Sequence, residues 1–135
     1  MSGTLAVSFL IPAYNAAATV ERAPGSVLAQ RGATQFEVVA LDDGSTDGTG
    51  EILERLAGAD SRVRVARLPR IGLVPALIRG QALCRGEYIA RMDADDLAHP
   101  DRLALQLALM ERDSRLGLVG TQVRYFPDSS VQAGA

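Results

Sequence analysis

The sequence predicts an α/β fold, in which a mostly parallel sheet is covered by helices on both faces. Three observations predict it. Short apolar runs rich in β-branched residues recur along the 135 residues, each bounded by glycine, proline or polar turn residues. Stretches with the spacing of one helix face lie between these runs. The crossovers from one run to the next are short, which favours parallel strands with right-handed connections.

The first predicted strand is the apolar run from Val7 to Ile11, which Pro12 closes. A helix is expected within residues 16–30, because apolar residues recur there at helical spacing. Pro24 and Gly25 lie inside that stretch and are expected to interrupt the helix.

The second predicted strand covers Phe36 to Leu41, which is rich in β-branched residues. A helix is expected over Thr49 to Leu56. Three polar residues just before it are candidates to cap its amino end: Ser45, Thr46 and Asp47.

The third predicted strand, Val63 to Leu68, alternates apolar and polar residues, as a strand with one polar face does. The next helix is expected to run to a stop at Gly86, with Pro75 in its first turn, where proline is tolerated. Four residues keep the spacing of one helix face: Leu73, Leu77, Gly80 and Cys84.

The last part of the chain contains a strand over Tyr88 to Met92 and a helix that opens at Pro100 and Asp101. A final strand is expected over Leu118 to Phe126, and residues 127–135 are expected to form a flexible tail. The last helix should bury Leu103, Leu107 and Met110.

Composition restricts the class of protein. A chain of 135 residues with 47% hydrophobic and 22% charged residues fits one soluble globular domain, residues 1–135. The net charge is −2, there is no lysine, and the arginines do not cluster, which argues against nucleic-acid binding. The apolar run Leu5 to Ile11 is too short to span a membrane and lacks the features of a signal peptide. We therefore expect a cytoplasmic protein in which Cys84 is a small buried side chain.

Polar clusters follow three of the predicted strands. They are Ala13 to Asn15 after the first strand, Asp42 to Gly48 after the second, and Asp93 to Asp96 after the fourth. In open α/β sheets ligands bind at the carboxyl ends of the strands. We therefore expect the three clusters to meet at one edge of the sheet.

Asp93, Asp95 and Asp96 lie within four residues, although like charges this close repel and raise one another's pKa. A divalent cation relieves the repulsion. Mg²⁺ and Mn²⁺ take oxygen ligands, and substrate phosphates with water complete such a site. A nucleoside diphosphate is therefore the expected ligand. In an extended segment Asp93 and Asp95 point the same way, whereas Asp96 should point opposite and cap the turn before Pro100.

Each of these residues also has a plain structural interpretation. The aspartates of the third cluster can simply cap and solvate a loop, and Asp43 belongs to a common turn composition. Tyr14 can be an ordinary exposed loop residue rather than a platform for a base. His99 is expected to be a loop residue rather than a ligand. Arg79 and Arg91 are within reach of a diphosphate in principle, but surface arginines are common.

Three ordered motifs resemble the nucleotide-binding half of family 2 glycosyltransferases, which have the GT-A fold. They are VSFLIPAYN, VVALDDGSTDGT and GLVPALIRGQALCRGEYIARMDADDLAHPDRL, and the resemblance runs from about Val7 to Val123. It implies a Rossmann-like sheet, expected to be cut short here relative to the family, and a role in cell-envelope polysaccharide synthesis.

The resemblance also implies the site residues. Tyr14 would stack on the base of a sugar nucleotide, and Asp43 would contact the base edge. Asp93 and Asp95 would form a DxD motif, with Asp93 near the ribose and Asp95 nearest to a Mg²⁺ or Mn²⁺ ion. The remaining residues that it implies at the nucleotide are Pro12, Ala13, Asn15 and Ala94.

The family transfers a sugar with inversion to an acceptor hydroxyl, whose proton a downstream carboxylate takes. After Leu118 to Phe126 the sequence offers only Asp128, so the catalytic base is expected to be missing from this chain. The resemblance implies a nucleotide-diphosphate sugar, with a UDP-sugar favoured, and a carbohydrate or lipid-linked acceptor. Membrane association at the inner face would belong to a longer parent protein. Ile78 and Gln81 depart from the residues that the family often has in this helix.

Three other functions are alternatives. Asp43, Ser45, Asp47, Gly48 and Glu54 match positions of an EF-hand calcium loop, but a predicted strand rather than a helix precedes them. A sugar-phosphate nucleotidyltransferase would be expected to have a glycine-rich, basic phosphate loop after the first strand, and AYNAAATVER has neither feature. A non-catalytic domain that binds a sugar nucleotide or a partner protein is the third alternative.

Overall fold

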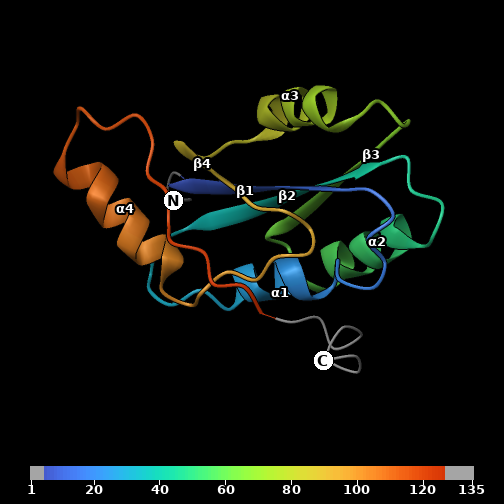
Figure 1. Ribbon diagram of the computed structural model, residues 1–135, viewed down its shortest axis with the longest axis horizontal. Coiled ribbons are helices and arrows are strands. Elements are labelled where there is room, and N and C mark those ends of the chain that lie inside the picture. Colours follow the sequence, from blue (N-terminus) through green and yellow to red (C-terminus); the bar gives the residue numbers. More distant parts are fainter. Residues whose placement is uncertain (1–4, 127–135) are drawn as a thin grey trace. The chain divides into compact units, whose positions relative to one another are not determined.

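The computed structural model describes residues 5–126 and contains a four-stranded parallel sheet with the strand order β3-β2-β1-β4 (Figure 1). Contacts divide the chain into two compact units, one ending at Ala104 and one beginning at Leu105, and the sheet lies in the first. The elements are β1 (Val7–Ala13), α1 (Arg22–Leu28), β2 (Phe36–Asp43), α2 (Thr49–Ala59), β3 (Val63–Leu68), α3 (Leu73–Leu83), β4 (Tyr88–Arg91) and α4 (Arg102–Arg112). This architecture confirms the predicted α/β fold.

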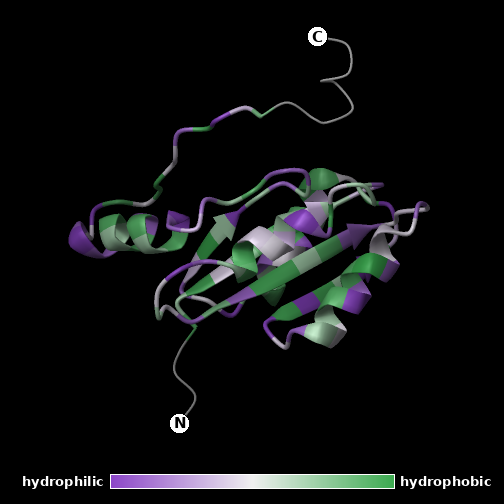
Figure 2. Ribbon diagram, turned by 90° about the horizontal axis from the view of Figure 1, so that it is seen from below, coloured by the Kyte–Doolittle hydropathy of each residue, from purple (hydrophilic) through white to green (hydrophobic). Residues whose placement is uncertain are grey.

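Helices cover both faces of the sheet. Figure 1 shows α3 on one face and α1 with α2 on the other. On the α3 face, Leu10 and Leu41 pack with Ala76. Phe9 and Val38 are fully buried and belong to the opposite face, because successive side chains of a strand alternate. Figure 2 shows the strands mainly hydrophobic, with hydrophilic residues frequent on the helices and loops.

The two central strands carry the core. Every residue of β1 and β2 is buried, whereas β3 and β4 at the sheet edges are partly exposed. Strands covered on both faces read as continuous apolar runs, which is why the sequence identified them. Gly80 lets α3 approach closely, since a Cβ there would lie 2.5 Å from Leu10 Cδ1 and 2.6 Å from Leu41 Cδ1. Leu73, predicted on the buried face of this helix, is instead 50% exposed.

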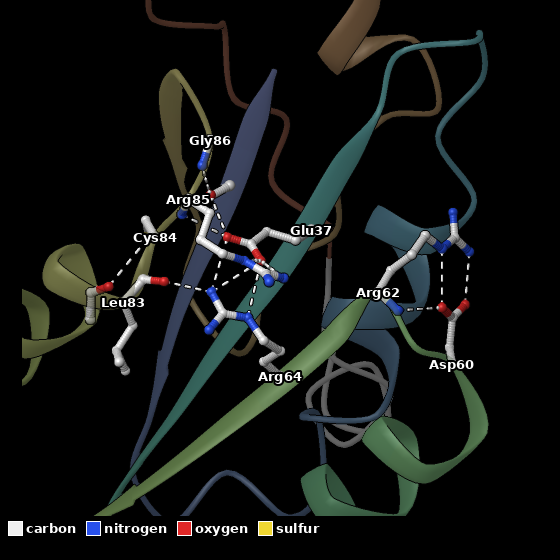
Figure 3. A network of polar contacts seen from close by, with 10 residues as sticks. Glu37, Asp60, Arg62, Arg64, Leu83, Cys84, Arg85 and Gly86 are labelled. Carbon is white, nitrogen blue, oxygen red and sulfur yellow. Dashed lines mark hydrogen bonds and ion pairs between the residues drawn. The ribbon is translucent and has the colours of Figure 1, made fainter. Parts of the chain in front are cut away.

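A buried carboxylate ties the amino-terminal end of the sheet to the chain that follows α3 (Figure 3). Glu37 of β2 accepts hydrogen bonds from the Ser8 hydroxyl at 2.8 Å and from the guanidinium of Arg64 at 3.0 and 3.1 Å. The backbone N–H and guanidinium of Arg85 also donate to it, at 2.8 to 3.1 Å. Burial alone would raise the pKa of Glu37, but the hydrogen bonds from Arg64, Arg85 and Ser8 outweigh it and lower the pKa to about 2.

Two helix predictions need correction. The chain from Ala16 to Glu21 forms turns, and α1 begins only at Arg22. The helix then continues through Pro24, because a residue in the first turn needs no intrahelical partner for its N–H. At the other end, α3 stops at Leu83 rather than reaching Gly86. Gly86 lies against β1, where a Cβ would be 2.5 Å from the Ser8 nitrogen.

The predicted strand over Leu118 to Phe126 is wrong, because the described residues 117–126 are in neither a strand nor a helix. The run has strand-like composition, but a strand forms only where a neighbour supplies backbone hydrogen bonds. Most of its large side chains are exposed, Leu118 at 86% and Tyr125 at 94%. The predicted flexible tail, residues 127–135, lies outside the described residues, and the single-domain prediction stays a prediction.

Two smaller predictions concern burial and membranes. Cys84 is only partly buried, and its thiol donates to the Gly80 carbonyl at 3.3 Å. Burial raises the pKa of this thiol. Among the described residues, no helix is long and apolar enough to cross a membrane.

The buried Glu37 should make stability depend on acid. Its pKa is about 2 in the folded chain against 4.5 for the free side chain, so its contribution is complete above pH 4.5 and is lost as the pH falls toward 2. The difference corresponds to about 3 kcal/mol. We expect Glu37→Gln to lower the free energy of unfolding at pH 7 and to flatten its decline below pH 5. Urea denaturation from pH 2 to 7 measures both, with the exposed Glu54→Gln as the control; equal pH dependence in Glu37→Gln and wild type would contradict this role.

Candidate donor-binding site

The carboxyl ends of β1, β2 and β4 lie at one edge of the sheet, because all of its strands are parallel. The predicted polar clusters follow these ends, as expected. Pro12 and Ala13 are the last residues of β1 and are buried, with Pro12 opposite Leu41 and Ala13 opposite Asp42 in β2. Tyr14 follows directly after these two buried residues, and 45% of its surface is exposed.

The loop after β1 is bonded to the turn after β2. Asn15 has a left-handed backbone, with φ 47°, and its N–H donates to Ser45 Oγ at 2.9 Å. Its side-chain oxygen accepts from the Thr46 N–H, also at 2.9 Å. Asn15 therefore presents Tyr14 by fixing the loop. Two further bonds join the same loops: Ala16 N–H to Thr49 Oγ1 at 2.9 Å and Ala17 N–H to Asp47 Oδ2 at 3.1 Å.

The predicted cap of α2 takes a different form. Gly48 is the residue at the amino end of the helix, with φ 93° and no side-chain cap. Asp47 instead accepts from the Thr49 hydroxyl at 2.6 Å and from the Thr49 N–H at 3.1 Å. The hydrogen bond from the Thr49 hydroxyl is the main cause of the lowered pKa of Asp47. Ser45 and Thr46 bond to Asn15, so they hold the Tyr14 loop rather than the helix.

The two adjacent aspartates at the end of β2 have separate partners. Asp42 accepts from the Ser45 N–H at 3.0 Å and lies 3.4 Å from the Arg67 guanidinium. Asp43 accepts from the N–H groups of Ile71 and Gly72, at 2.8 and 3.0 Å. Both carboxylates are buried, at 2% exposed side-chain surface for Asp42 and 3% for Asp43. Their first role in the chain is therefore to hold the loops at this edge.

Arg70 joins the two predicted base-binding residues, and sequence reasoning missed it. Its guanidinium donates to Asp43 and lies 3.6 Å from the centroid of the Tyr14 ring, a cation–π contact. The Arg70 backbone lies against Gly44, where a Cβ would be 2.5 Å from the Arg70 nitrogen. The side chain remains 51% exposed. Arg70 follows β3, which carries none of the predicted clusters, so only the fold could reveal it.

The acidic cluster forms a tight turn beyond β4. The Asp96 N–H donates to the Asp93 carbonyl at 3.2 Å, and carboxylate oxygens of Asp93, Asp95 and Asp96 lie within 4.8 Å of one another. The prediction that Asp96 points away is wrong, because these residues are in a turn rather than an extended segment. Burial, and then the charges of Asp95 and Asp93, raise the pKa of Asp96. Arg91 pairs with Asp93 at 2.6 Å.

These oxygens suit a hard divalent cation. All three side chains are exposed and so accessible to water and phosphate oxygens, which Mg²⁺ and Mn²⁺ retain or recruit as further ligands. Ala94, which is 6% exposed, anchors the middle of the turn. His99 is an exposed loop residue as predicted, with its Nδ1 accepting from the Asp101 N–H at 3.1 Å.

The calcium-loop alternative fails on this geometry. A strand, β2, leads into Asp43, whose carboxylate is bonded to the loop after β3. Asp47 points its carboxylate at Thr49 and Ala17. The carboxylates that an EF-hand would turn toward one ion therefore have other partners.

Asp43→Asn tests the tie between β2 and the loop after β3. The amide of asparagine has the same shape as the carboxylate. Its NH₂ group, however, would face N–H groups that donate to the carboxylate in the wild type. We expect a loss of about 1–2 kcal/mol in the free energy of unfolding, because the buried side chain at this position no longer accepts from all of its partly buried donors. Chemical denaturation at pH 7 measures the loss, with the exposed Glu54→Gln as control. An unchanged unfolding midpoint would show that Asp43 does not hold this loop.

Curated relatives of this chain include a chondroitin synthase and a succinoglycan biosynthesis protein. The chain is 38% identical over 128 residues to the chondroitin synthase of Pasteurella multocida (strain Pm70), which covers 94% of this chain and 13% of that protein. It is 44% identical over 98 residues to the succinoglycan biosynthesis protein ExoO of Rhizobium meliloti (strain 1021), covering 72% and 27%. The chain thus spans less than a third of the length of these relatives.

Solved structures with a similar fold include two complexes with sugar nucleotides. S. aureus TarS 1-349 in complex with UDP-GlcNAc has a TM-score of 0.71 at 25% identity, covering 79% of this chain and 31% of that one. The mannosyltransferase PcManGT from Pyrobaculum calidifontis, in complex with GDP-Man and Mn²⁺, has a TM-score of 0.69 at 28% identity, covering 77% and 32%. The sheet is therefore that of a GT-A glycosyltransferase. A family model described as "Glycosyl transferase family 2" matches residues 8–134, and this chain belongs to that family.

Proposed function

We propose that this chain forms the donor site of an inverting glycosyltransferase and binds a nucleotide-diphosphate sugar together with Mg²⁺ or Mn²⁺. The observation that carries the proposal is the single sheet edge, where Tyr14, the Asp43–Arg70 pair and the acidic turn follow neighbouring strands. Ligands bind at such an edge in open α/β sheets. Two structural neighbours were solved in complex with UDP-GlcNAc and with GDP-Man and Mn²⁺.

The base of the donor would stack on Tyr14. Arg70 covers that ring in this structure, but its side chain is half exposed and can move while its backbone stays against Gly44. Asp43 would accept from a ring N–H of the base, and Arg70 would donate to the neighbouring carbonyl oxygen. Uracil, thymine and guanine carry an N–H beside a carbonyl, whereas cytosine and adenine present an acceptor nitrogen there. A UDP-sugar fits this pair, as do dTDP- and GDP-sugars.

The diphosphate would lie toward the acidic turn. Asp95 and Asp93 would hold the cation, with Asp96 close enough to contribute. When bound, the cation stabilises the negative charge that develops on the departing nucleoside diphosphate. Four uncharged residues would shape the nucleotide site: Pro12, Ala13, Asn15 and Ala94.

Transfer to an acceptor needs a carboxylate that takes the proton of the acceptor hydroxyl. We propose that none of the described residues is this carboxylate, so that the chain alone binds the donor and does not transfer the sugar. The acceptor would be a growing carbohydrate or a lipid-linked sugar in the cytoplasm, in line with the polysaccharide-related names of the relatives. Sugar transfer by the purified chain would contradict this part of the proposal.

The proposed function predicts that UDP binds in a metal-dependent way. We expect calorimetric titration of the chain with UDP to give a measurable affinity with Mn²⁺ and at least a tenfold weaker one without it. Asp95→Ala should abolish the effect of Mn²⁺, because it removes a ligand from the acidic turn. Glu87→Gln, an exposed carboxylate before β4, is the matched control and should bind as wild type does. Equal binding by Asp95→Ala in the presence of Mn²⁺ would refute the metal site.

The proposed function also predicts that the site distinguishes uracil from cytosine. UDP should bind at least about tenfold more tightly than CDP if Arg70 donates to the C4 carbonyl of uracil. Cytosine has an acceptor at N3 facing Asp43 and an amino group at C4 facing Arg70, a double mismatch that costs about 1–3 kcal/mol. Arg70→Met keeps an unbranched side chain but removes the charge and the donors, so it should narrow the difference in affinity between UDP and CDP. Tyr14→Phe keeps the ring and should bind UDP normally, whereas Tyr14→Ala should weaken every nucleotide. If CDP bound as well as UDP to wild type, this assignment of Asp43 and Arg70 would be wrong.

A further inference from the structure

The segment after the acidic turn is hydrogen-bonded to the end of α1, more than 60 residues earlier in the chain. The Ala98 N–H donates to Ser26 Oγ at 2.9 Å, and the Arg31 N–H donates to the Pro100 carbonyl at 2.8 Å. The Ser26 hydroxyl itself donates to the Ala23 carbonyl at 2.7 Å, which leaves its oxygen free to accept from Ala98. This segment is thus fixed by groups that no sequence motif marked.

Gln30 makes the most extensive of these contacts. Its Nε2 donates to the His99 carbonyl at 2.7 Å, and its Oε1 accepts from the Leu103 N–H at 2.9 Å. Nε2 also donates to the Ser26 carbonyl within the same turn of chain, at 3.3 Å. One amide therefore holds both the loop at His99 and the first turn of α4, whose N–H groups lack helical partners.

The acidic turn lies between this attachment and the sheet. Arg91 is the last residue of β4, and its carbonyl accepts from the Arg102 guanidinium at 3.1 Å. Ala98, 8% exposed, is the first residue bonded to α1. Only the residues from Met92 to Leu97 separate these two fixed points, and they include all three aspartates. Their carboxylates repel one another, and the bonds at both ends of the turn, together with the buried Ala94 in its middle, oppose that repulsion.

We propose that Gln30 is a positioning residue that holds the acidic turn closed, so that its carboxylates stay close enough to share one cation. The consequence for the cation rests on the proposed function, but the effect on the turn does not. A purely structural alternative is that Gln30 only caps α4 through the Leu103 N–H. The positioning role requires the hydrogen bond from Gln30 to the His99 carbonyl, whereas the capping role requires only the bond from the Leu103 N–H.

Two substitutions separate them. Gln30→Glu keeps an acceptor for Leu103 and replaces the donor to His99 by a second acceptor, which repels the carbonyl. Gln30→Met has a similar length and makes neither bond. Gln81→Met, on the exposed side of α3, is the matched control. Val63→Ala, a buried edge-strand residue away from this segment, controls for a general loss of stability.

The first readout is amide hydrogen exchange over residues 92–98 in the chain without added metal. The second is Mn²⁺ affinity, alone and with UDP, measured by electron paramagnetic resonance. We expect both Gln30 variants, but neither control, to exchange faster over 92–98 and to bind Mn²⁺ about threefold to tenfold more weakly, the scale of one lost hydrogen bond. A cap-only role predicts that Gln30→Glu behaves as wild type.

Unchanged exchange over 92–98 in Gln30→Glu and Gln30→Met would overturn the proposal whatever the metal does. Faster exchange with unchanged Mn²⁺ affinity would overturn its functional half, because the turn would then not need Gln30 to form the site. If wild type itself bound no Mn²⁺, the proposed function would fail, and the exchange measurement would still decide whether Gln30 holds the turn.

Discussion

The parallel pairing of β1 with β2 is the constraint on which the rest of this edge depends. The register runs from Val7 opposite Phe36 to Ala13 opposite Asp42, and every residue of both strands is buried. A shift of one residue would turn each buried side chain to the other face, so packing on two sides fixes the register. It thereby fixes where both loops leave the sheet. Asn15 and the Ser45–Thr46 turn meet only because the strands end side by side.

The alternation of side chains along β2 explains why two consecutive aspartates serve two loops. Val39, Leu41 and Asp43 lie on the face that packs against α3, and Asp42 lies on the opposite one. Asp43 therefore reaches the loop that leads into α3, whereas Asp42 reaches Ser45 and Arg67. Gly50 of α2 lies against the Asp42–Arg67 pair. A Cβ at this position would be 2.4 Å from both the Arg67 guanidinium and the Asp42 carboxylate, so a larger residue would displace the pair. The two aspartates thus organise both sides of one strand end.

Sequence reasoning succeeded where the signal is local and failed where it depends on distant partners. The buried strands β1 and β2 are mainly apolar runs, and the polar clusters at their ends could be placed by topology alone. Arg70 and Gln30 could not, since a single arginine after β3 and a glutamine at the end of α1 resemble ordinary surface residues until the fold brings them to Asp43 and His99. The strand expected over Leu118 to Phe126 was assigned from composition, but pairing needs a neighbour. The orientation of Asp96 was inferred from an extended chain that in fact turns.

The carboxylates of this chain are treated in two opposite ways, and the contrast bears on function. Glu37, Asp42 and Asp43 are buried, and each is paired with at least one arginine, as buried charges must be. Asp93, Asp95 and Asp96 are exposed and turned toward one another. Arg91 pairs with Asp93 and offsets part of the repulsion among the three carboxylates. The buried Ala94 and the attachment of the following segment to α1 hold the turn together against the repulsion that remains. In the proposed function, the cation would complete this group of carboxylates.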